Sequence, residues 1–251
     1  MMRANFDLTG KRALVTGAGR GIGRGVAEAL ASAGATVTLC ARSSSEITEA
    51  AEAIVAAGGT ADTLAMDVTD TRAFARAIDA REPFEIFVNN AGTNRPALVQ
   101  DVTDEDFDLI IGLNLKAAVF AAQAVARGMV RAGRGGSIIN MSSQMGHIGA
   151  AKRSIYCASK WAIEGFSKSL AIELGPHGVR VNTICPTFIE TPLTQPYFTD
   201  GAFREEVLGK IKLGRLGQVQ DILGAAVFLA SDASALTTGS ALMVDGGWTA
   251  E

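Results

Sequence analysis

Short apolar runs rich in valine, isoleucine and leucine alternate with longer helical patterns along the whole chain. This alternation indicates βαβ units, in which helices cover both faces of a parallel sheet and the strands are apolar on both sides. No linker or repeat divides the 251 residues, and a hydrophobic content of 48% is enough for one large core. The sequence therefore predicts an α/β fold with a single domain over residues 1–251, built on a doubly wound parallel sheet of about seven strands with helices on both faces.

The expected elements follow from the change between apolar runs and helical periodicity. We expect strands at residues 12–16, 36–40, 60–66, 86–89, 137–141, 179–184 and 241–244, and helices at residues 21–32, 46–57, 71–80, 104–131, 155–174 and 219–230. Residues 187–214 fit neither pattern. Connections of that length are uncommon unless they are functional, so we expect a lid with a short helix around residues 202–212.

The charge and cysteine content exclude several classes of protein. With 23 basic and 26 acidic residues and no basic run, the chain has no signature of a nucleic-acid partner. Residues 1–12 hold no signal peptide, and no apolar run approaches the about 20 residues of a membrane span, so we expect no membrane partner. Cys40, Cys157 and Cys185 are odd in number and form no C-x-x-C pair, which argues against disulfides or zinc and favours the reducing cytoplasm.

A glycine-rich turn follows the first expected strand and runs directly into a helix. It reads Thr16-Gly-Ala-Gly-Arg-Gly-Ile-Gly23. Such glycines let the backbone approach a pyrophosphate, whose charge the helix N-terminus then stabilises. A tight strand-to-helix turn is the alternative, but the position on the first strand of a doubly wound sheet favours a Rossmann-type dinucleotide site. Its expected contacts are Gly17, Arg20, Gly21, Ile22 and Gly23.

The residues after the second strand bear on the choice of dinucleotide. They read Cys40-Ala41-Arg42-Ser43 and include no carboxylate that would accept hydrogen bonds from the ribose of NAD. A cation at this place suits the 2′-phosphate of NADP, so NADP(H) is favoured. NAD(H) stays possible, because Arg42 could instead be solvated or stack on the adenine.

Tyr156 and Lys160 lie four residues apart and therefore share one face of an expected helix. A cation about 4 Å from a phenol, at an effective dielectric constant of about 20, contributes about 4 kcal/mol. That is enough to bring the phenol pKa from about 10 to about 7. The pair therefore predicts a general acid/base, and the alternative is a solvated helix face.

Further motifs occur in order along the chain: Asp67-Val68, Asn89-Asn90-Ala91-Gly92, Asn114, Ser142-Ser143 thirteen positions before Tyr156, and Val244-Asp245-Gly246-Gly247. With them, essentially the whole chain resembles the classical short-chain dehydrogenases/reductases. The resemblance implies hydride transfer between NAD(P)(H) and a secondary alcohol or ketone, with residues 1–92 mainly binding the dinucleotide and residues 93–251 forming the catalytic and substrate half. It also implies a homotetramer.

The resemblance assigns roles residue by residue. It implies that Tyr156 is the acid/base, Lys160 its activator and ribose anchor, Ser143 the carbonyl-orienting hydroxyl, and Asn114 the holder of a water behind the lysine. The other implied cofactor contacts are Asp67, Val68, Asn90, Ala91, Gly92, Pro186, Ile189 and Thr191. Without the resemblance, Asn114 could be an ordinary surface or kink residue of a long helix, and Asp67 could be a helix N-cap.

The chain departs from the family pattern at Thr187, where a glycine usually follows the proline. The expected substrate pocket lies between Tyr156 and the lid and is lined by Asn94, Arg95, Ser143, Gln144, Met145, His147, Arg153, Thr187, Phe188 and Tyr197. The cations Arg95, His147 and Arg153 could accept an anionic group, or they could be solvated loop charges. His147 and His177 are far apart in sequence, and we expect no metal ligand.

The substrate class is open at this stage. Similarity to gluconate 5-dehydrogenase-type members puts a sugar acid or polyol first. The alternatives are a 3-oxoacyl-carrier-protein reductase and a 3-hydroxy acid dehydrogenase. A non-catalytic dinucleotide sensor is the alternative of another class, although sensors of this kind usually lack the tyrosine or the lysine.

Overall fold

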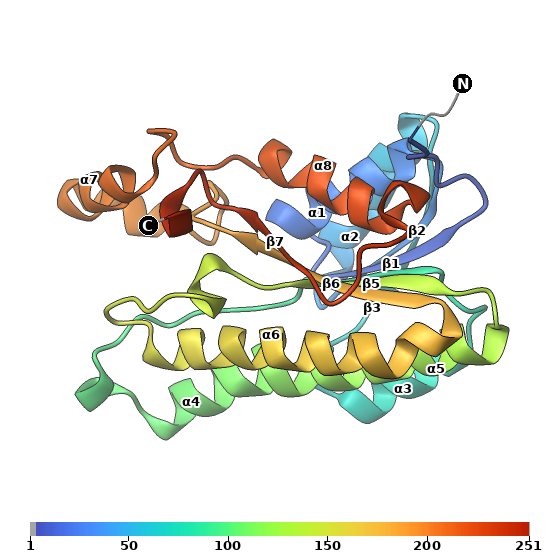
Figure 1. The fold of residues 1–251 in the computed structure, drawn as a ribbon, viewed down its shortest axis with the longest axis horizontal. Coiled ribbons are helices and arrows are strands. Elements are labelled where there is room, and N and C mark those ends of the chain that lie inside the picture. The colour runs from blue at the N-terminus through green and yellow to red at the C-terminus, as the bar shows by residue number, and fades with distance from the viewer. Residues whose placement is uncertain (1–3, 251) are drawn as a thin grey trace.

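The structure, a computed structural model, describes residues 4–250. Its centre is one parallel sheet of seven strands in the order β3-β2-β1-β4-β5-β6-β7 (Figure 1). The strands are β1 (Arg12–Thr16), β2 (Thr36–Ala41), β3 (Thr60–Ala65), β4 (Ile86–Asn89), β5 (Gly136–Met141), β6 (Val179–Pro186) and β7 (Ala241–Val244). The predicted doubly wound sheet is confirmed, and each predicted strand is present within one or two residues of its expected bounds.

Helices cover both faces of the sheet (Figure 1). One layer contains α1 (Gly21–Ser32), α2 (Ser44–Ala56) and α8 (Val219–Ala230), and the other contains α3 (Thr71–Asp79), α4 (Asp104–Ile111), α5 (Ala118–Ala132) and α6 (Ser154–Leu174). Single turns of 3₁₀ helix occupy Val99–Asp101, Gln144–Gly146, Gly175–His177, Asp232–Ser234 and Trp248–Ala250.

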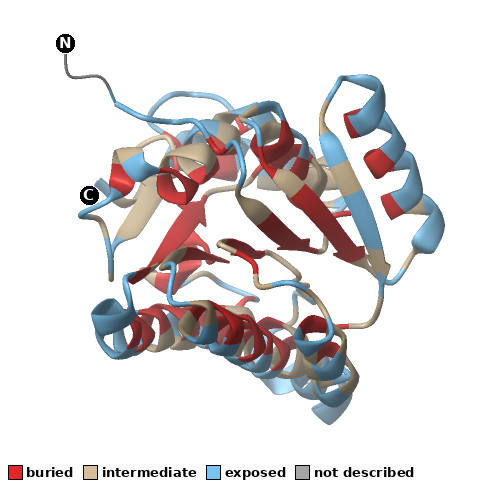
Figure 2. Ribbon diagram, turned by 90° about the vertical axis from the view of Figure 1, so that its right-hand side faces the viewer, coloured by how far each residue is buried: buried red, intermediate tan, exposed pale blue. Residues whose placement is uncertain are grey.

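Each layer of helices shares a separate apolar core with the sheet. On β1, Ala13 and Val15 pack with α1, α2 and α8, whereas Leu14 between them packs with α3, α5 and α6. Successive strand side chains point to opposite faces, so a strand covered on both sides must be apolar at every position. Figure 2 shows these central strands as buried and the outward faces of the helices as exposed. Strand β3 forms one edge and has no fully buried residue.

The expected long helix from residue 104 contains an interruption. A π-helical segment, Gly112–Ala117, separates α4 from α5. Such widened turns are rare and occur frequently at functional sites. Taken across this segment, residues Asp104–Ala132 have a mean hydropathy of 1.7 over 18 residues, which is the length and composition that a membrane span would need. Half of that stretch is buried inside the protein, as in a core helix.

Residues 187–214 form a separate unit beyond the end of β6. It contains a 3₁₀ segment, Gln195–Thr199, and α7 (Gly201–Lys210), so the short helix expected at residues 202–212 is present and begins one residue earlier. Val207, Ile211 and Leu216 form a small apolar cluster there with Phe188, Phe203 and neighbouring rings. The segment therefore packs into an apolar cluster apart from the two main cores, and Leu216 and Trp248 complete this cluster.

Candidate active site

The glycine turn lies at the carboxyl end of β1, where the strand order reverses between β1 and β4. Ligands of open α/β sheets bind at this crevice. Gly17 and Gly21 have left-handed φ angles of +65° and +56°. A Cβ atom on Gly23 would lie 2.2 Å from the Gly17 carbonyl oxygen and 2.5 Å from the Asn90 amide nitrogen. The turn is thus a cradle that only glycine can form.

Two features prepare this cradle for a phosphate. The Asn90 side-chain amide donates to the carbonyls of Thr16 (2.9 Å) and Gly17 (3.3 Å), which fixes the turn. No side chain caps the N-terminus of α1, so its first-turn N–H groups remain available. The residues present therefore fit the pyrophosphate of a dinucleotide, which Gly17, Gly21 and Gly23 would hold at the positive end of the helix.

Charged residues surround the expected adenosine side of this site. Arg42 is exposed directly after β2, and the exposed Arg20 lies 3.9 Å from Glu46. The Asp67 carboxylate accepts hydrogen bonds from the backbone N–H (2.9 Å) and hydroxyl (2.7 Å) of Thr69. Burial raises the pKa of Asp67, but these bonds and the Arg42 charge outweigh it, so the net pKa is lowered. The N-cap of α3 is Asp70, so Asp67 is not the cap that the alternative interpretation proposed.

Of the other expected cofactor contacts, Val68 is buried in the apolar core and Ile22 packs against the core of the opposite layer. Pro186 ends β6, and Ile189 is buried just beyond it. Thr191 reaches back to the glycine turn, since its side chain would lie 3.5 Å from a Cβ on Gly21. The structure thus brings the start of the 187–214 segment against the phosphate cradle.

Asn114 lies inside the π-helical segment and is 2% exposed, which rules out the surface interpretation. Its side-chain oxygen accepts from the Thr93 N–H (2.8 Å), and its amide donates to the Thr93 carbonyl (2.8 Å) and the Ser159 hydroxyl (3.2 Å). A Cβ on Gly92 would lie 3.4 Å from the Asn114 oxygen and 3.9 Å from the Lys160 ammonium nitrogen. Asn114 and Lys160 therefore both border Gly92, at the end of β4.

Tyr156 and Lys160 lie on α6, as their spacing predicts. The buried Lys160 ammonium donates to the Met141 carbonyl (2.8 Å) and lies 5.6 Å from the centre of the Tyr156 ring. Burial lowers the pKa of Lys160 to about 8, against the raising effects of Cys185 and Glu164. The Ser143 hydroxyl accepts from the Met145 N–H (3.1 Å), which leaves its own proton available.

The predicted near-neutral pKa of the tyrosine is wrong for the protein without cofactor. Burial raises the pKa of Tyr156 to about 12, whereas a hydrogen bond with Ser143 and the charge of Arg153 lower it. The Lys160 ammonium donates to the Met141 carbonyl and lies 5.6 Å from the centre of the Tyr156 ring. The i to i+4 spacing determines that the two residues share a face, but it does not determine the distance between their polar ends.

The three cations expected to receive an anionic group are in different environments. Arg95 forms an ion pair with Asp106 (2.8 Å), and the Nε2 atom of His147 lies 3.5 Å from a Glu164 carboxylate oxygen. Arg153 is 7% exposed and its guanidinium lies 5.1 Å from the centre of the Tyr197 ring. Burial lowers the pKa of Arg153, and no carboxylate within residues 4–250 forms an ion pair with it. Of the three, only Arg153 keeps its charge available next to Tyr156.

Buried polar atoms without partners mark the substrate side. The side-chain oxygen of Asn94, both polar atoms of Gln144 and the hydroxyl of Thr187 have no hydrogen-bond partner in the described part of the chain. Leaving such groups unsatisfied costs about 1–3 kcal/mol each, and a bound ligand would supply the missing partners. Tyr156, Arg95 and Arg153 line a cavity of about 10 Å³, and Thr187 lines a cavity of about 440 Å³.

Glu164 and Cys185 were not among the candidate site residues identified from the sequence. Glu164 follows Lys160 by one helical turn and is buried, and its carboxylate contacts both Cys185 and His147. The i to i+4 relation to Lys160 was the available sequence signal. The contacts with Cys185 and His147 join three separate elements, so local spacing could not reveal them.

A phosphate cradle at the switch point of a doubly wound sheet, followed by a Ser, Tyr and Lys set at the same edge, defines an NAD(P)-dependent oxidoreductase. Comparisons with known proteins agree. The profile of a family described as enoyl-(acyl carrier protein) reductase matches residues 17–249. The chain belongs to the short-chain dehydrogenase/reductase family. It has both Tyr156 and Lys160, and the relatives are named as dehydrogenases and reductases, so the non-catalytic sensor alternative is not retained.

Similar proteins include several sugar-metabolising enzymes. The chain is 38% identical over 243 residues to L-xylulose reductase from Bos taurus, covering 97% of this chain and 98% of the relative. It is 39% identical over 248 residues to gluconate 5-dehydrogenase from Gluconobacter oxydans, with coverage of 97% and 96%. A solved gluconate 5-dehydrogenase from Burkholderia cenocepacia, in complex with NADP and tartrate, superposes with a TM-score of 0.95 at 36% identity, covering 99% of this chain and 98% of that one.

Proposed function

We propose that this enzyme interconverts a secondary hydroxyl and a keto group on a sugar acid, with NADP(H) as cofactor. The observation that carries the substrate class is Arg153, a buried guanidinium beside Tyr156 with no ion-pair partner in residues 4–250. A buried cation of this kind is stabilised by a carboxylate that binds with the substrate. Among the relatives, the name gluconate 5-dehydrogenase supports a sugar acid. The names L-xylulose reductase and D-erythrulose reductase support the wider sugar class only, because those two sugars carry no carboxylate.

When bound, the nicotinamide supplies or accepts the hydride. In reduction, the Tyr156 hydroxyl donates a proton to the developing alkoxide; in oxidation, its phenolate accepts the alcohol proton. The Ser143 oxygen accepts from the Met145 N–H, and its hydroxyl donates to the same substrate oxygen and stabilises the charge that develops there. The raised pKa of Tyr156 keeps the phenol protonated at neutral pH without cofactor, which is the form that reduction requires.

Lys160 and Asn114 support this proton transfer. The Lys160 ammonium is positioned by the Met141 carbonyl and borders Gly92, where it can bind the nicotinamide ribose. Asn114 is held by Thr93 and Ser159 and faces the same glycine. We assign Asn114 to hold a water that connects the lysine to solvent.

A charge-reversal experiment tests the cofactor. Replacing Arg42→Asp introduces the carboxylate that suits NAD and removes the cation that suits a 2′-phosphate. We expect the ratio of kcat/KM for NADPH to that for NADH to fall at least about 100-fold, which corresponds to about 3 kcal/mol. Arg76→Asp, an exposed change on the outer helix α3, is the matched control. An unchanged ratio in Arg42→Asp contradicts the role of Arg42.

A substrate panel tests the proposed class. Sugar acids, uncharged polyols and β-keto thioesters are assayed with the native enzyme and with Arg153→Met. Loss of a charge-assisted hydrogen bond costs about 1.5–3 kcal/mol, so kcat/KM for the sugar acid should fall about 10- to 100-fold more than that for an uncharged polyol. Equal losses for both substrates contradict the role of Arg153. A clear preference for β-keto thioesters favours the acyl-carrier-protein reductase alternative.

Three further expectations are part of the proposal. Residues 187–214 act as a lid, which is supported by the contact of Thr191 with the glycine turn. A location in the cytoplasm is supported by the three free cysteines. A homotetramer is supported by exposed apolar side chains on the α4 to α6 layer, at Phe107, Leu109, Phe120, Trp161 and Ile172. Sedimentation velocity measures the assembly, and a monomer at micromolar concentration contradicts it.

A further inference from the structure

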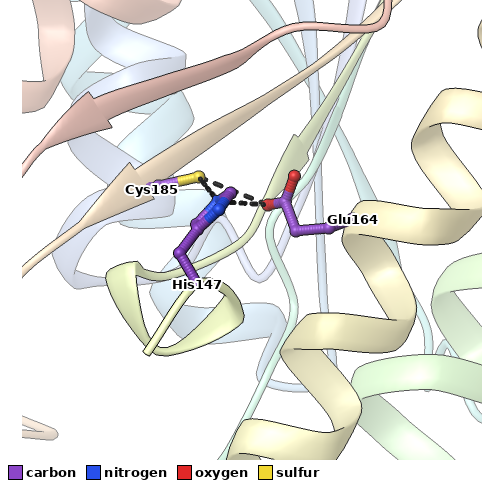
Figure 3. A group of neighbouring side chains, drawn as sticks. All are labelled: His147, Glu164 and Cys185. Atoms are coloured by element: carbon purple, nitrogen blue, oxygen red, sulfur yellow. Dashed lines mark hydrogen bonds and ion pairs between the residues drawn. The ribbon is translucent and has the colours of Figure 1, made fainter. Parts of the chain in front are cut away.

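Three side chains from three different elements converge at one point (Figure 3). Two of them, Cys185 and Glu164, lie close enough to Lys160 to raise its pKa. His147 follows the short turn after β5, Glu164 comes from α6 and Cys185 comes from β6. The Cys185 sulfur lies 3.4 Å from the His147 Nε2 atom and 3.3 Å from a Glu164 carboxylate oxygen, and that oxygen lies 3.5 Å from His147 Nε2. The triangle of nitrogen, oxygen and sulfur atoms is thus nearly equilateral.

These separations match one face of a tetrahedral metal site. With zinc bond lengths of about 2.3 Å to sulfur and about 2.0–2.1 Å to nitrogen and oxygen, tetrahedral angles place the ligand atoms about 3.3–3.6 Å apart. The observed distances of 3.4, 3.3 and 3.5 Å fall in that range. A cation could therefore bind all three atoms with little rearrangement of the side chains.

A neighbouring hydroxyl orients the Glu164 carboxylate. The Thr183 hydroxyl donates to the second Glu164 oxygen (3.0 Å), which leaves the first oxygen directed at His147 and Cys185. Hydrogen bonds of this kind to a ligating carboxylate are typical of metal sites. The buried Ser142 hydroxyl lies close enough to Cys185 to lower its pKa, yet within residues 4–250 it has no partner at normal hydrogen-bond geometry. An unsatisfied polar atom thus lies beside the triangle.

The charge balance allows a divalent cation. Burial, followed by the Glu164 charge, raises the pKa of the Cys185 thiol to about 12, so the thiol is neutral without metal. Binding forms one metal–sulfur bond and releases the thiol proton to solvent. The bound divalent cation, the Glu164 carboxylate, the Cys185 thiolate and a neutral ligating imidazole then sum to zero charge. The Lys160 ammonium opposes the incoming charge, whereas the Glu164 and Cys185 anions offset it.

Solvent reaches the cluster through the histidine. The His147 side chain is 31% exposed and the Glu164 side chain 8% exposed. An ion can therefore enter on the His147 side, and a water would complete the tetrahedron as the fourth ligand.

We propose that His147, Glu164 and Cys185 form a binding site for one divalent cation of the thiolate- and imidazole-preferring class, such as Zn²⁺. A thiolate, an imidazole and a single carboxylate select this class over Mg²⁺ and Ca²⁺, which require several oxygen ligands. The site does not depend on the proposed sugar-acid activity, because metal binding is measured without substrate or cofactor.

Cobalt titration of the full chain, freed of metal with a chelator, tests the site. Co²⁺ bound by a thiolate gives a sulfur-to-metal charge-transfer absorption, and Zn²⁺ should displace it at one ion per chain. We expect Cys185→Ser to abolish this absorption, whereas the matched variants Cys40→Ser and Cys157→Ser, at buried cysteines outside the cluster, retain it. His147→Gln should weaken cobalt affinity at least about 10-fold, and its partly exposed position makes it tolerant of replacement.

Other outcomes overturn the proposal. No charge-transfer absorption in the native protein, whose fold is checked by circular dichroism, means that the three residues form a hydrogen-bonded cluster only. Equal absorption in native protein and in Cys185→Ser assigns the metal to another cysteine. If Cys185→Ser does not fold, the cobalt affinity of His147→Gln tests the site instead. An unchanged cobalt affinity in that variant rejects the site.

Discussion

The ionisation of Tyr156 gives a direct test of how burial controls the candidate acid/base. The chain contains two tyrosines, Tyr156 and Tyr197, so Tyr197→Phe leaves one phenol to titrate. The phenylalanine ring keeps the surface that Arg153 contacts at 5.1 Å. Phenolate absorbance in this variant therefore reports Tyr156 alone.

The structure gives the size of the expected pKa shift of Tyr156. Burial raises the pKa of Tyr156 to about 12, against the lowering effects of Ser143 and Arg153. Relative to an ordinary phenol of about 10, this corresponds to about 3 kcal/mol favouring the neutral form. At pH 10, about 1% of Tyr156 should be ionised, whereas about half of a solvated tyrosine would be. Because the folded-state pKa is raised, the folded state loses stability as the pH rises from about 10 to about 12.

The assay records phenolate absorbance between pH 7 and 10.5, with circular dichroism to confirm that the protein stays folded. Tyr156→Phe/Tyr197→Phe supplies the baseline. Addition of NADP⁺ should shift the titration to lower pH, since the nicotinamide ring brings a positive charge next to the phenol. Half-ionisation at or below pH 9 in the folded, cofactor-free variant would refute the dominance of burial and restore the lysine as the main influence.

Three further predictions follow from buried groups. Lys160→Met should abolish activity, yet it should stabilise the cofactor-free protein by about 1–3 kcal/mol at pH 7, as measured by urea unfolding. The reason is that burial lowers the pKa of Lys160 to about 8, so the buried ammonium destabilises the folded state below pH 8. This gain in stability should disappear as the pH rises from 8 to about 10.5. Gly23→Ala should lower the free energy of unfolding by about 3 kcal/mol and weaken NADP(H) binding, because its Cβ would lie 2.2 Å from the Gly17 carbonyl oxygen. Gly224→Ala in α8 is the control and should be neutral or stabilising, because a Cβ there has no neighbour within 4 Å. Similar calorimetric Tm values for the two variants would contradict the cradle. Asn114→Ala should lower stability by about 3 kcal/mol and also reduce kcat, and a stability loss with unchanged kcat limits Asn114 to a structural role.

Much of the fold follows from local patterns in the sequence. The apolar runs of β1, β4, β5 and β6 predict strands covered on both faces, and glycines at fixed positions predict the turn before α1. The π-helical segment around Asn114 was not predictable, because the helical period on both sides of it continues unchanged. The sequence predicted helix α7 within about two residues, whereas the apolar cluster around it depends on Trp248, which lies far along the chain.

The sequence by itself determined the order of strands and helices, the phosphate turn and the shared helix face of Tyr156 and Lys160. These features depend on the spacing of residues along the chain, which can be read directly from the sequence. Only the tertiary structure decided the protonation of Tyr156, the free charge of Arg153 and the meeting of Glu164 with Cys185. Desolvation and side-chain partners depend on which elements pack together, and residues 21 positions apart on a helix and a strand have no common period.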